Sequence, residues 1–367
     1  MSAPDYLAAA PSFLQTAAWA EFWQEAMEEK HSYHLVEFEN DTAKISAYLY
    51  QYPWHLNQCF LYLPKGPVWI QKQKSAPALM IKTLREFWYE VVQVASENEC
   101  TYIKADFDEQ IFGILGVEDN ETLLELLETI QSPDGRKKFP KIELRGETKS
   151  IQYLQTMVLD TESVKTASPA TYTVAALRKF YEDNPEFWAR TNQNIRRYTK
   201  KTLKGDWEIT VGSQESNFED FWQVYQDTAK RQNFATHDRA YFAALAEKDF
   251  SHVITLGQEG EVQCVWFGVA SGDTLTYLYG GNTESALKSK AQYLMHVAAL
   301  RLLKDLGLRY YDLGGYDADK GFGKFKEGYR GEIRTFLGPV DVVLESRKYD
   351  FTNKFVGAAK SLTSWIR

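Results

Sequence analysis

Cysteine is scarce in this sequence. The 367 residues include three cysteines, Cys59, Cys100 and Cys264, which lie far apart and form no CxxC pair. This distribution predicts neither a disulfide framework nor a zinc site, and it is typical of a reducing, cytoplasmic compartment. His31 and His34 are three positions apart, but no third ligand is evident near them. We therefore expect neither a bound metal nor a cofactor.

Signals for export and for membrane insertion are missing as well. The N-terminal stretch has no basic segment, and Pro11 interrupts its apolar run, so no signal peptide is expected. Residues 45–64 carry no charged side chain, which could indicate a membrane span. Gln51, Pro53 and His55 in the middle of this run instead favour two strands joined by a turn. We expect no transmembrane segment.

Positive charge is in deficit, with a net charge of -8, which excludes general adhesion to nucleic acid. Any such contact needs a local basic patch, and residues 187–204 supply one. On a helix, Arg196, Lys200 and Lys204 share a face, with Arg197 and Lys201 beside it. The patch predicts either contact with the phosphates of a nucleic acid or nucleotide, or a solvated helix face.

Hydrophobic residues make up 44% of the chain and charged residues 25%, which is typical of a globular protein, and the length fits two domains. The order helix, strand meander, helix, strand occurs twice. It predicts two related α+β domains with mixed, mainly antiparallel sheets. The joint falls in a stretch rich in Ser, Thr, Ala and Pro, so we place domain 1 at 1–165, domain 2 at 166–345 and a C-terminal segment at 346–367.

The periodicity of apolar residues locates the individual elements. In the first half it predicts helices at 13–30, 78–98 and 123–130, strands at 35–38, 45–52, 59–63 and 101–106, and a charged loop at 132–149. In the second half it predicts helices at 218–233 and 292–306 and strands at 253–256, 262–269, 275–279 and 309–313.

The segment 309–331 combines a short strand, the break Gly314-Gly315, a polar loop and the dipeptide Phe325-Lys326 among glycines. Glycines allow close backbone approach and positive φ angles, so a lysine among them can serve as a fixed positive charge. The alternative is a surface loop that returns to a final strand.

Five segments follow one another in a characteristic order: FLQTAAW at 13–19, YLPKGPV at 62–68, the strand at 152–160, the basic helix at 191–201, and YYDLGG at 310–315 followed by Phe325-Lys326. In this order they resemble the FemXAB family, the aminoacyltransferases that build peptidoglycan cross-bridges. The resemblance covers nearly the whole chain. It implies two GNAT-like domains with a cleft between them and a last segment that packs back on domain 1. No long heptad run is present, so the chain is similar to the compact members without a helical arm.

The resemblance also implies a reaction in which an amine of a muropeptide attacks the ester carbonyl of an aminoacyl-tRNA. The implied partners are aminoacyl-tRNA, bound by the basic helix, and a peptidoglycan precursor that is lipid-linked or UDP-linked. A lipid-linked acceptor would bring the chain into peripheral contact with the inner face of the membrane.

Individual residues match the family's site residues. Lys326 matches the lysine that stabilises the developing oxyanion, and Phe325 matches its neighbour. Asp106 matches a carboxylate near the cleft, either as a proton acceptor or as a structural hydrogen-bond partner at a strand end. Tyr241 and Tyr279 match tyrosines that line the acceptor site, with buried core tyrosines as the alternative.

Two positions depart from the family pattern. Compact members have a lysine early in the first helix, where this chain has Trp23 and no lysine, and an arginine near position 237, where it has His237. If the acceptor carries a diphosphate, Arg239 or Lys65 must bind it, and otherwise Trp23 packs on sugar or peptide.

Two other functions remain open. A GNAT-type acyltransferase in envelope or polysaccharide biosynthesis would use acyl-CoA, whose pyrophosphate is usually bound by a [QR]xxGx[GA] loop at a helix start. The corresponding residues 287–292 contain no glycine, which disfavours this function. A non-catalytic protein that binds tRNA or cell-wall precursors is the third hypothesis.

Overall fold

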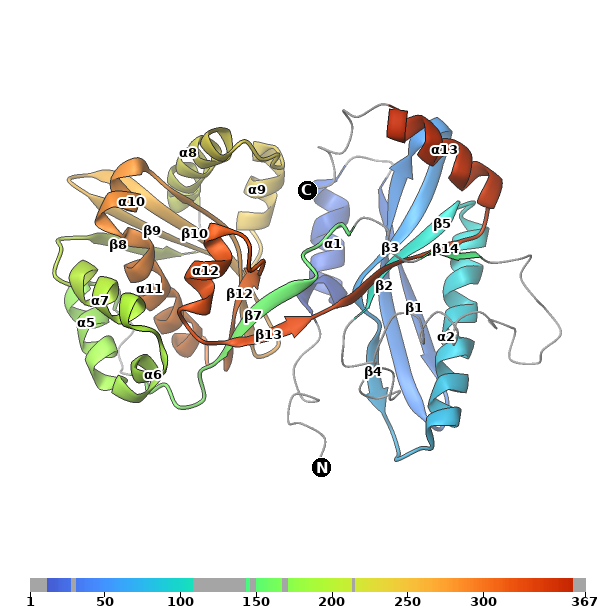
Figure 1. Ribbon diagram of the computed structural model, residues 1–367, viewed down its shortest axis with the longest axis horizontal. Helices are drawn as coiled ribbons and strands as arrows, with labels where there is room; N and C mark the ends of the chain where they lie inside the picture. The colour runs from blue at the N-terminus through green and yellow to red at the C-terminus, as the bar shows by residue number, and fades with distance from the viewer. Residues whose placement is uncertain are drawn as a thin grey trace. The chain divides into compact units, whose positions relative to one another are not determined.

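The computed structural model describes residues 12–27, 31–107, 143–145, 150–166, 171–212 and 215–358. These residues form two compact units, and each has its own mixed sheet (Figure 1). The first unit contains the described residues up to 154 together with 335–358, and the second contains the described residues of 155–334. The cleft predicted between the domains stays a prediction.

The unit boundaries differ from the predicted boundaries at 165/166 and 345/346. Strand β7 (Gln155–Asp160) pairs with β12 (Tyr310–Gly315) in the second sheet, and β14 (Leu337–Val343) pairs with β5 (Tyr102–Phe107) in the first. The units therefore meet at 154/155 and 334/335. Strand pairing decides membership of a sheet, whereas the Ser, Thr and Pro content marks only the loop that follows β7.

The first unit is a seven-stranded sheet in the order β1-β2-β3-β5-β14-β6, with β4 beside β2. The parallel pair is β3–β5, and the other pairs are antiparallel. Helix α2 covers one face with Leu84, Phe87 and Trp88 in the core. Besides β5 and β14, the described residues of this unit form η2 (Phe13–Gln15), α1 (Ala17–Ala26), β1 (Ser32–Glu39), β2 (Ala43–Trp54), η3 (His55–Asn57), β3 (Gln58–Gly66), β4 (Val68–Gln71), α2 (Pro77–Glu97), β6 (Glu143–Arg145) and α13 (Ser346–Ala358).

Most predicted elements of this unit are present, and the uncharged run 45–64 forms two strands, as expected. The helix predicted at 13–30 begins later, because Thr16 caps α1 by accepting the N–H of Trp19, and it ends at Ala26. The helix predicted at 123–130 lies outside the described residues, as does most of the predicted loop 132–149, of which 143–145 form β6. Helix α13 packs Tyr349 against Phe60, Tyr62 and Tyr102 of the same unit.

The second unit is also a seven-stranded sheet, in the order β13-β7-β12-β11-β10-β9-β8. The pair β11–β12 is parallel, and the pairs β7–β12, β10–β11, β9–β10 and β8–β9 are antiparallel. Its further elements are α5 (Val174–Asp183), α6 (Pro185–Arg190), α7 (Gln193–Thr202), β8 (Glu208–Gly212), α8 (Glu215–Gln232), α9 (Arg239–Ala246), β9 (Ser251–Gln258), β10 (Glu261–Ser271), β11 (Thr274–Asn282), α10 (Glu284–Ser289), α11 (Ala291–Asp305), α12 (Gly321–Glu327) and β13 (Glu332–Thr335).

Helices cover both faces of the second sheet (Figure 1). Helix α11, with twelve buried residues, packs on Ile254 and Trp266. On the other face Phe221 of α8 and Phe242 of α9 pack with each other, and Phe221 also contacts Phe267. The predicted fold class, two α+β domains with mixed and mainly antiparallel sheets, is therefore confirmed.

One local prediction for this unit is wrong. The basic helix predicted within 187–204 is two helices, because Asn192 breaks it and caps α7 by accepting the N–H of Ile195. Phe325 and Lys326 lie on the short helix α12, so the alternative of a surface loop does not hold for these two residues. In the part of the chain that the structure describes, no helix is long and apolar enough to cross a membrane.

Candidate functional site

The parallel strands β11 and β12 are paired in register over a short stretch. Their register runs over Thr274↔Tyr310, Leu275↔Tyr311 and Thr276↔Asp312 and then stops. Opposite β7, the register of β12 shifts between Asp312 and Gly315. Gly314 at this bulge has φ +74, and a Cβ there would lie 2.4 Å from the Tyr277 carbonyl oxygen, so only glycine fits. The irregular carboxyl end of β12 therefore depends on this glycine, whose backbone lies against Tyr277 of β11.

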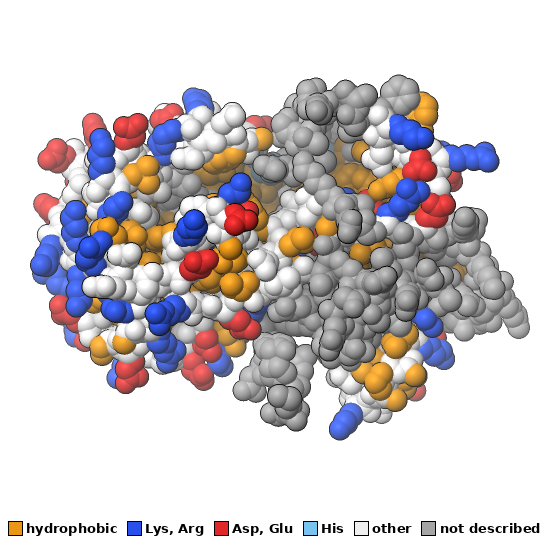
Figure 2. Space-filling view, viewed as in Figure 1, with side chains coloured by type: hydrophobic (Ala, Val, Ile, Leu, Met, Phe, Trp, Pro, Cys, Tyr) orange, Lys and Arg blue, Asp and Glu red, His pale blue; other side chains and the backbone are white. Residues whose placement is uncertain are grey.

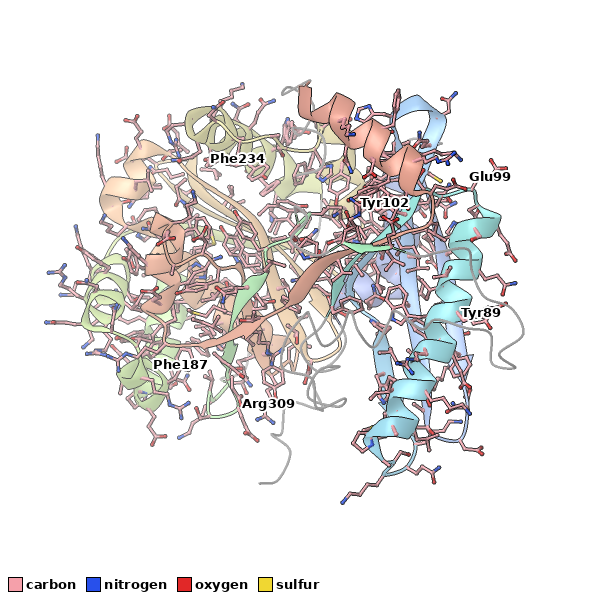
Figure 3. All side chains as sticks on the ribbon, turned by 45° about the vertical axis from the view of Figure 1, so that its right-hand side comes forward. Tyr89, Glu99, Tyr102, Phe187, Phe234 and Arg309 are labelled. Atoms are coloured by element: carbon pink, nitrogen blue, oxygen red, sulfur yellow. The ribbon has the colours of Figure 1, made fainter. Side chains whose placement is uncertain are left out.

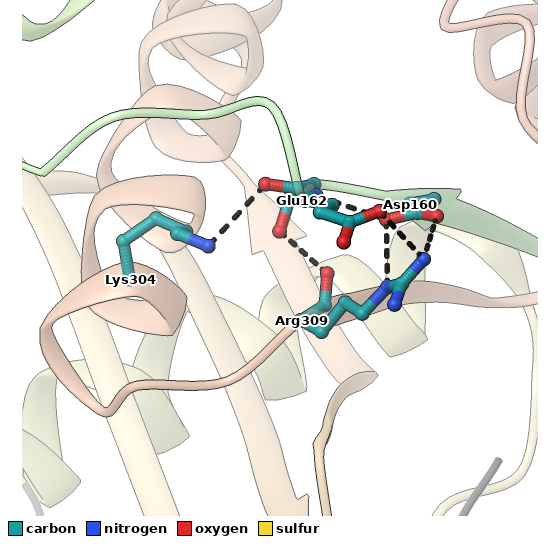
Figure 4. Close-up of polar contacts among 5 residues, drawn as sticks. Asp160, Glu162, Lys304 and Arg309 are labelled. Carbon is teal, nitrogen blue, oxygen red and sulfur yellow. Dashed lines mark hydrogen bonds and ion pairs between the residues drawn. The ribbon is translucent and has the colours of Figure 1, made fainter. Parts of the chain in front are cut away.

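The paired end of β12 is held by charges (Figure 4). The Arg309 guanidinium contacts Asp160 at 2.8 Å and Glu162 at 2.9 Å, and Lys304 Nζ donates to the Thr161 carbonyl at 3.3 Å. The hydrogen bond from Arg309 lowers the pKa of Asp160. These contacts fix the start of β12 against β7, so the irregular part of the strand lies at its carboxyl end.

Lys326 lies at the carboxyl end of β12. Its Nζ donates to the Gly315 carbonyl at 2.5 Å, and its side chain is nearly buried, with the residue 8% exposed. Burial lowers the pKa of Lys326 to about 8, against the attraction of the Asp312 carboxylate. Asp312 is itself engaged, since its Oδ1 accepts the N–H of Gly314 and the hydroxyl of Thr156. Lys326 thus combines a fixed position with an easily lost proton.

A buried hydrogen-bond chain lies behind this lysine. Trp266 Nε1 donates to the Tyr311 hydroxyl at 3.0 Å, and that hydroxyl lies 2.8 Å from His296 Nδ1. Burial, with the nearby charge of Lys326, lowers the pKa of His296 to about 3, so its imidazole is neutral. Because the imidazole is neutral, its Nδ1 can accept the hydrogen bond that the Tyr311 hydroxyl donates. Sequence reasoning missed His296, although a histidine in the apolar run 294–300 is a recognisable signal.

Phe325 points into the core instead of toward solvent. Its ring centroid lies 5.2 Å from Tyr293, 5.4 Å from His296 and 5.6 Å from Tyr329. These contacts attach α12 to α11. A Cβ at Gly323 would lie 1.9 Å from the Asp317 carbonyl oxygen, so the start of α12 needs this glycine to pack on the preceding loop.

The basic helix α7 joins the same assembly. The backbone N–H of Asn192, at the start of α7, donates to the Gly328 carbonyl at the end of α12 at 2.8 Å. Arg197, Lys200, Lys201 and Lys204 are exposed, and Figure 2 shows Lys and Arg side chains gathered over this part of the second unit. Arg196 differs, because its guanidinium donates to the carbonyls of Thr191 and Ala189 and so closes the α6–α7 junction.

The predicted acceptor residues Tyr241, Tyr279 and His237 gather on the other face of the sheet. The His237 ring stacks on Tyr241 at 3.8 Å, and Tyr279 lies 4.8 Å from Phe242. The register between β10 and β11 shifts at Phe267/Gly268 and skips Leu278 of β11, so Tyr277 faces His296 whereas Tyr279 faces Phe242 on the other side of the sheet.

Charge at this second cluster is limited. Burial lowers the pKa of His237, with Asp238 acting in the opposite direction, so the ring is neutral. Arg239 is exposed and pairs with Glu219, and its guanidinium lies 5.3 Å from the Phe218 ring. Of the two side chains, only Arg239 carries a charge that could bind phosphate, and it would have to leave Glu219 to do so.

The first unit holds the remaining predicted residues. Asp106 is 1% exposed and accepts the Tyr62 hydroxyl, and burial raises its pKa. Trp23 is buried against Tyr50 and Tyr52, with ring centroids 5.0 and 5.2 Å away. The Lys65 ammonium lies 4.3 Å from the centroid of the Phe336 ring. Among the described residues, no group of three or more His, Cys, Asp or Glu side chains could hold a metal ion.

Comparisons with known proteins agree with this architecture. Residues 189–327 match the family described as Acetyltransferase (GNAT) domain. The crystal structure of FemX is similar with a TM-score of 0.68 and 14% identity, over 93% of this chain and 94% of that chain. L-PGS from Bacillus licheniformis has a TM-score of 0.50 and 10% identity, over 88% of each chain. No curated protein matches the sequence. The resemblance to the FemXAB family is thus confirmed at the level of the fold.

Proposed function

We propose that this protein transfers an amino acid from aminoacyl-tRNA to an amine of a peptidoglycan precursor. The observation that carries the proposal is Lys326, a nearly buried lysine with a lowered pKa at the carboxyl end of β12. The FemX-like fold and the basic helix beside α12 support it. The function would place the protein in the cytoplasm, with peripheral membrane contact for a lipid-linked acceptor.

Lys326 would act on the ester carbonyl. An ammonium group has three N–H donors, and Lys326 uses one of them on Gly315, so another is left for the oxygen that becomes negatively charged. Such a preorganised donor favours the transition state over the ground state. With a pKa of about 8, the same group can also protonate the departing ribose hydroxyl.

The other predicted residues receive proposed roles that follow from their surroundings. Asp106 would accept a proton from the attacking amine, because burial raises its pKa and strengthens it as a base. Phe325 would fix α12 and not touch substrate. Arg197, Lys200 and Lys201 of α7 and Lys204 of the turn after it would bind tRNA phosphates. Tyr241, Tyr279, His237 and Arg239, with Trp23 and Lys65 of the first unit, would bind the acceptor.

A transfer assay tests the proposal. The purified chain is incubated with a mixture of charged tRNAs and, in separate reactions, with UDP-linked and lipid-linked muropeptides. Mass spectrometry should detect an acceptor heavier by one amino-acid residue, and deacylated tRNA should replace charged tRNA. Binding of charged tRNA without product would contradict the enzymatic proposal and favour a non-catalytic binding protein.

The match to the Acetyltransferase (GNAT) domain favours one second candidate, an N-acyltransferase that uses acyl-CoA. The junction before α11, where such an enzyme usually binds pyrophosphate, has Lys290 with φ 69 and no glycine. The same acceptors incubated with acyl-CoA separate the two candidates, because the mass added identifies the donor. An acyl product with acyl-CoA and none with charged tRNA would overturn the aminoacyl proposal.

A further inference from the structure

Cys59 and Cys100, 41 positions apart in the sequence, are neighbours in the first unit. Their Sγ atoms lie 2.6 Å apart, and both are free thiols. Cys59 is on β3, and Cys100 lies in the turn between α2 and β5. The backbone holds the two positions together, because Thr101 N donates to the Cys59 carbonyl at 2.8 Å. No movement of a strand is needed to bring the two sulfurs into contact.

The two thiols differ in access. Cys59 is partly exposed, whereas Cys100 is 2% exposed. A reagent in solution therefore reaches Cys59 first, and the only described sulfur within reach of Cys100 is that of Cys59. This is the arrangement of an attacking and a resolving cysteine.

The surroundings of Cys59 favour its thiolate. The hydrogen bond from the Cys100 thiol lowers the pKa of Cys59, and Gln51 contributes in the same direction, against burial and the charge of Glu99. Gln51 is oriented by its neighbours, since its Oε1 accepts from Ser32 at 3.2 Å and lies 2.9 Å from His34 Nε2. Figure 3 shows Glu99 after α2 and Tyr102 on β5, on either side of the turn. The attacking role thus falls to Cys59.

We propose that Cys59 and Cys100 form an oxidative modification site that a low-molecular-weight disulfide converts to a protein disulfide. In the first step the Cys59 thiolate attacks one sulfur of the reagent, which gives a mixed disulfide and releases one small thiolate. In the second step Cys100 loses its proton and attacks Sγ of Cys59, which releases the second small thiol. Two protein thiols are oxidised and one small disulfide is reduced to two thiols.

Oxidised glutathione is the probe, and the native full-length chain is the target. Intact mass should fall by the mass of two hydrogens, and a non-reducing peptide map should contain a Cys59–Cys100 cross-link. Cys264, which is buried elsewhere, should keep its thiol and serves as the internal control. Three free thiols after the incubation, or a mixed disulfide on Cys59 that persists, would overturn the proposal.

Variants resolve the order of the steps. Cys100→Ser should stop at the glutathione adduct on Cys59, because the resolving thiol is absent. Cys59→Ser should leave Cys100 unmodified in the folded protein. Cys264→Ser should form the cross-link as the wild type does. Equal labelling of Cys59 and Cys100 in the two single variants would contradict the assigned roles, and the wild-type peptide map decides the question if a variant does not fold.

Discussion

The two units contain the same kind of parallel strand pair, and the two pairs differ in length. In the first unit the register of β3 and β5 runs from Phe60↔Tyr102 to Gly66↔Phe107, with a shift between Pro64 and Gly66. In the second, the register of β11 and β12 ends after Thr276↔Asp312, and Lys326 of α12 donates to the carbonyl of Gly315 at the end of β12. Similar architecture therefore yields a longer parallel pair in the first unit and a shorter one in the second.

Each unit also buries a lysine, and the partners of the two lysines differ. Lys104 in the first unit pairs with Asp341 at 2.6 Å, and the Tyr349 hydroxyl donates to the same carboxylate. Lys326 in the second forms no ion pair with any described residue and donates to a backbone carbonyl. A lysine ammonium group that is paired with a carboxylate stabilises the fold. An ammonium group that donates only to a backbone carbonyl keeps N–H donors available for a substrate. The comparison assigns a supporting role to Lys104 and agrees with the role proposed for Lys326.

The largest expected effect comes from Lys104→Met. This change leaves Asp341 as a buried carboxylate without its cation, and removal of one partner of a buried ion pair costs about 3–5 kcal/mol. We expect the free energy of unfolding, measured by urea denaturation, to fall by this order. The double variant Lys104→Met with Asp341→Leu should regain most of the loss. A single variant as stable as the wild type would remove the assigned supporting role.

Lys326→Met should affect turnover instead of stability. Loss of one preorganised donor to an oxyanion lowers kcat by about 10²–10³. The thermal midpoint should not fall, because no ion pair is broken. Lys324→Met, an exposed lysine on the same helix, is the matched control and should retain wild-type kcat. If Lys326→Met raised KM and left kcat unchanged, Lys326 would be a binding residue.

The basic surface offers a smaller and graded effect. Replacement of Lys200, Lys201 and Lys204 by Ala should weaken binding of charged tRNA and lower the slope of log affinity against log salt by about one unit per lost phosphate contact. Fluorescence anisotropy over a salt series measures both quantities.

The matched control removes the same charge from the first unit, with Lys44, Lys72 and Lys82 changed to Ala. These three lysines form surface ion pairs, so we expect this variant to leave the salt slope unchanged. Equal effects from the two triple variants would mean that net charge alone governs binding.

The sequence predicts most of the helices and strands and selects Lys326, but it does not predict the local geometry around this lysine. Apolar periodicity placed α11 and β12, and the resemblance selected Lys326 before any contact was known. The bulge could not be predicted, because Gly314-Gly315 has the composition of a strand end, and only pairing with β7 reveals it. Burial of Lys326 likewise depends on long-range packing. The position of Arg196 on the basic helical face predicts a phosphate contact, whereas its guanidinium donates to nearby backbone carbonyls.

The last prediction uses pH to compare wild type with Lys326→Met. The pKa of Lys326 in the folded protein is about 8, and an unfolded lysine has a pKa of about 10.4. Between these values the unfolded chain binds more protons, so the free energy of unfolding contributed by this group rises with pH. Lys326→Met lacks the group, so wild type should gain stability relative to the variant across this window.

Turnover should respond in the opposite direction over the same range. Because the ammonium form of Lys326 binds the oxyanion, kcat/KM should fall about tenfold per pH unit above pH ~8. Urea denaturation and turnover measured at the same pH values test both signs on one group. A wild-type stability that falls relative to Lys326→Met above pH ~8 would show that the folded pKa is not lowered. The contrast with the ion-paired lysine of the first unit would then fail.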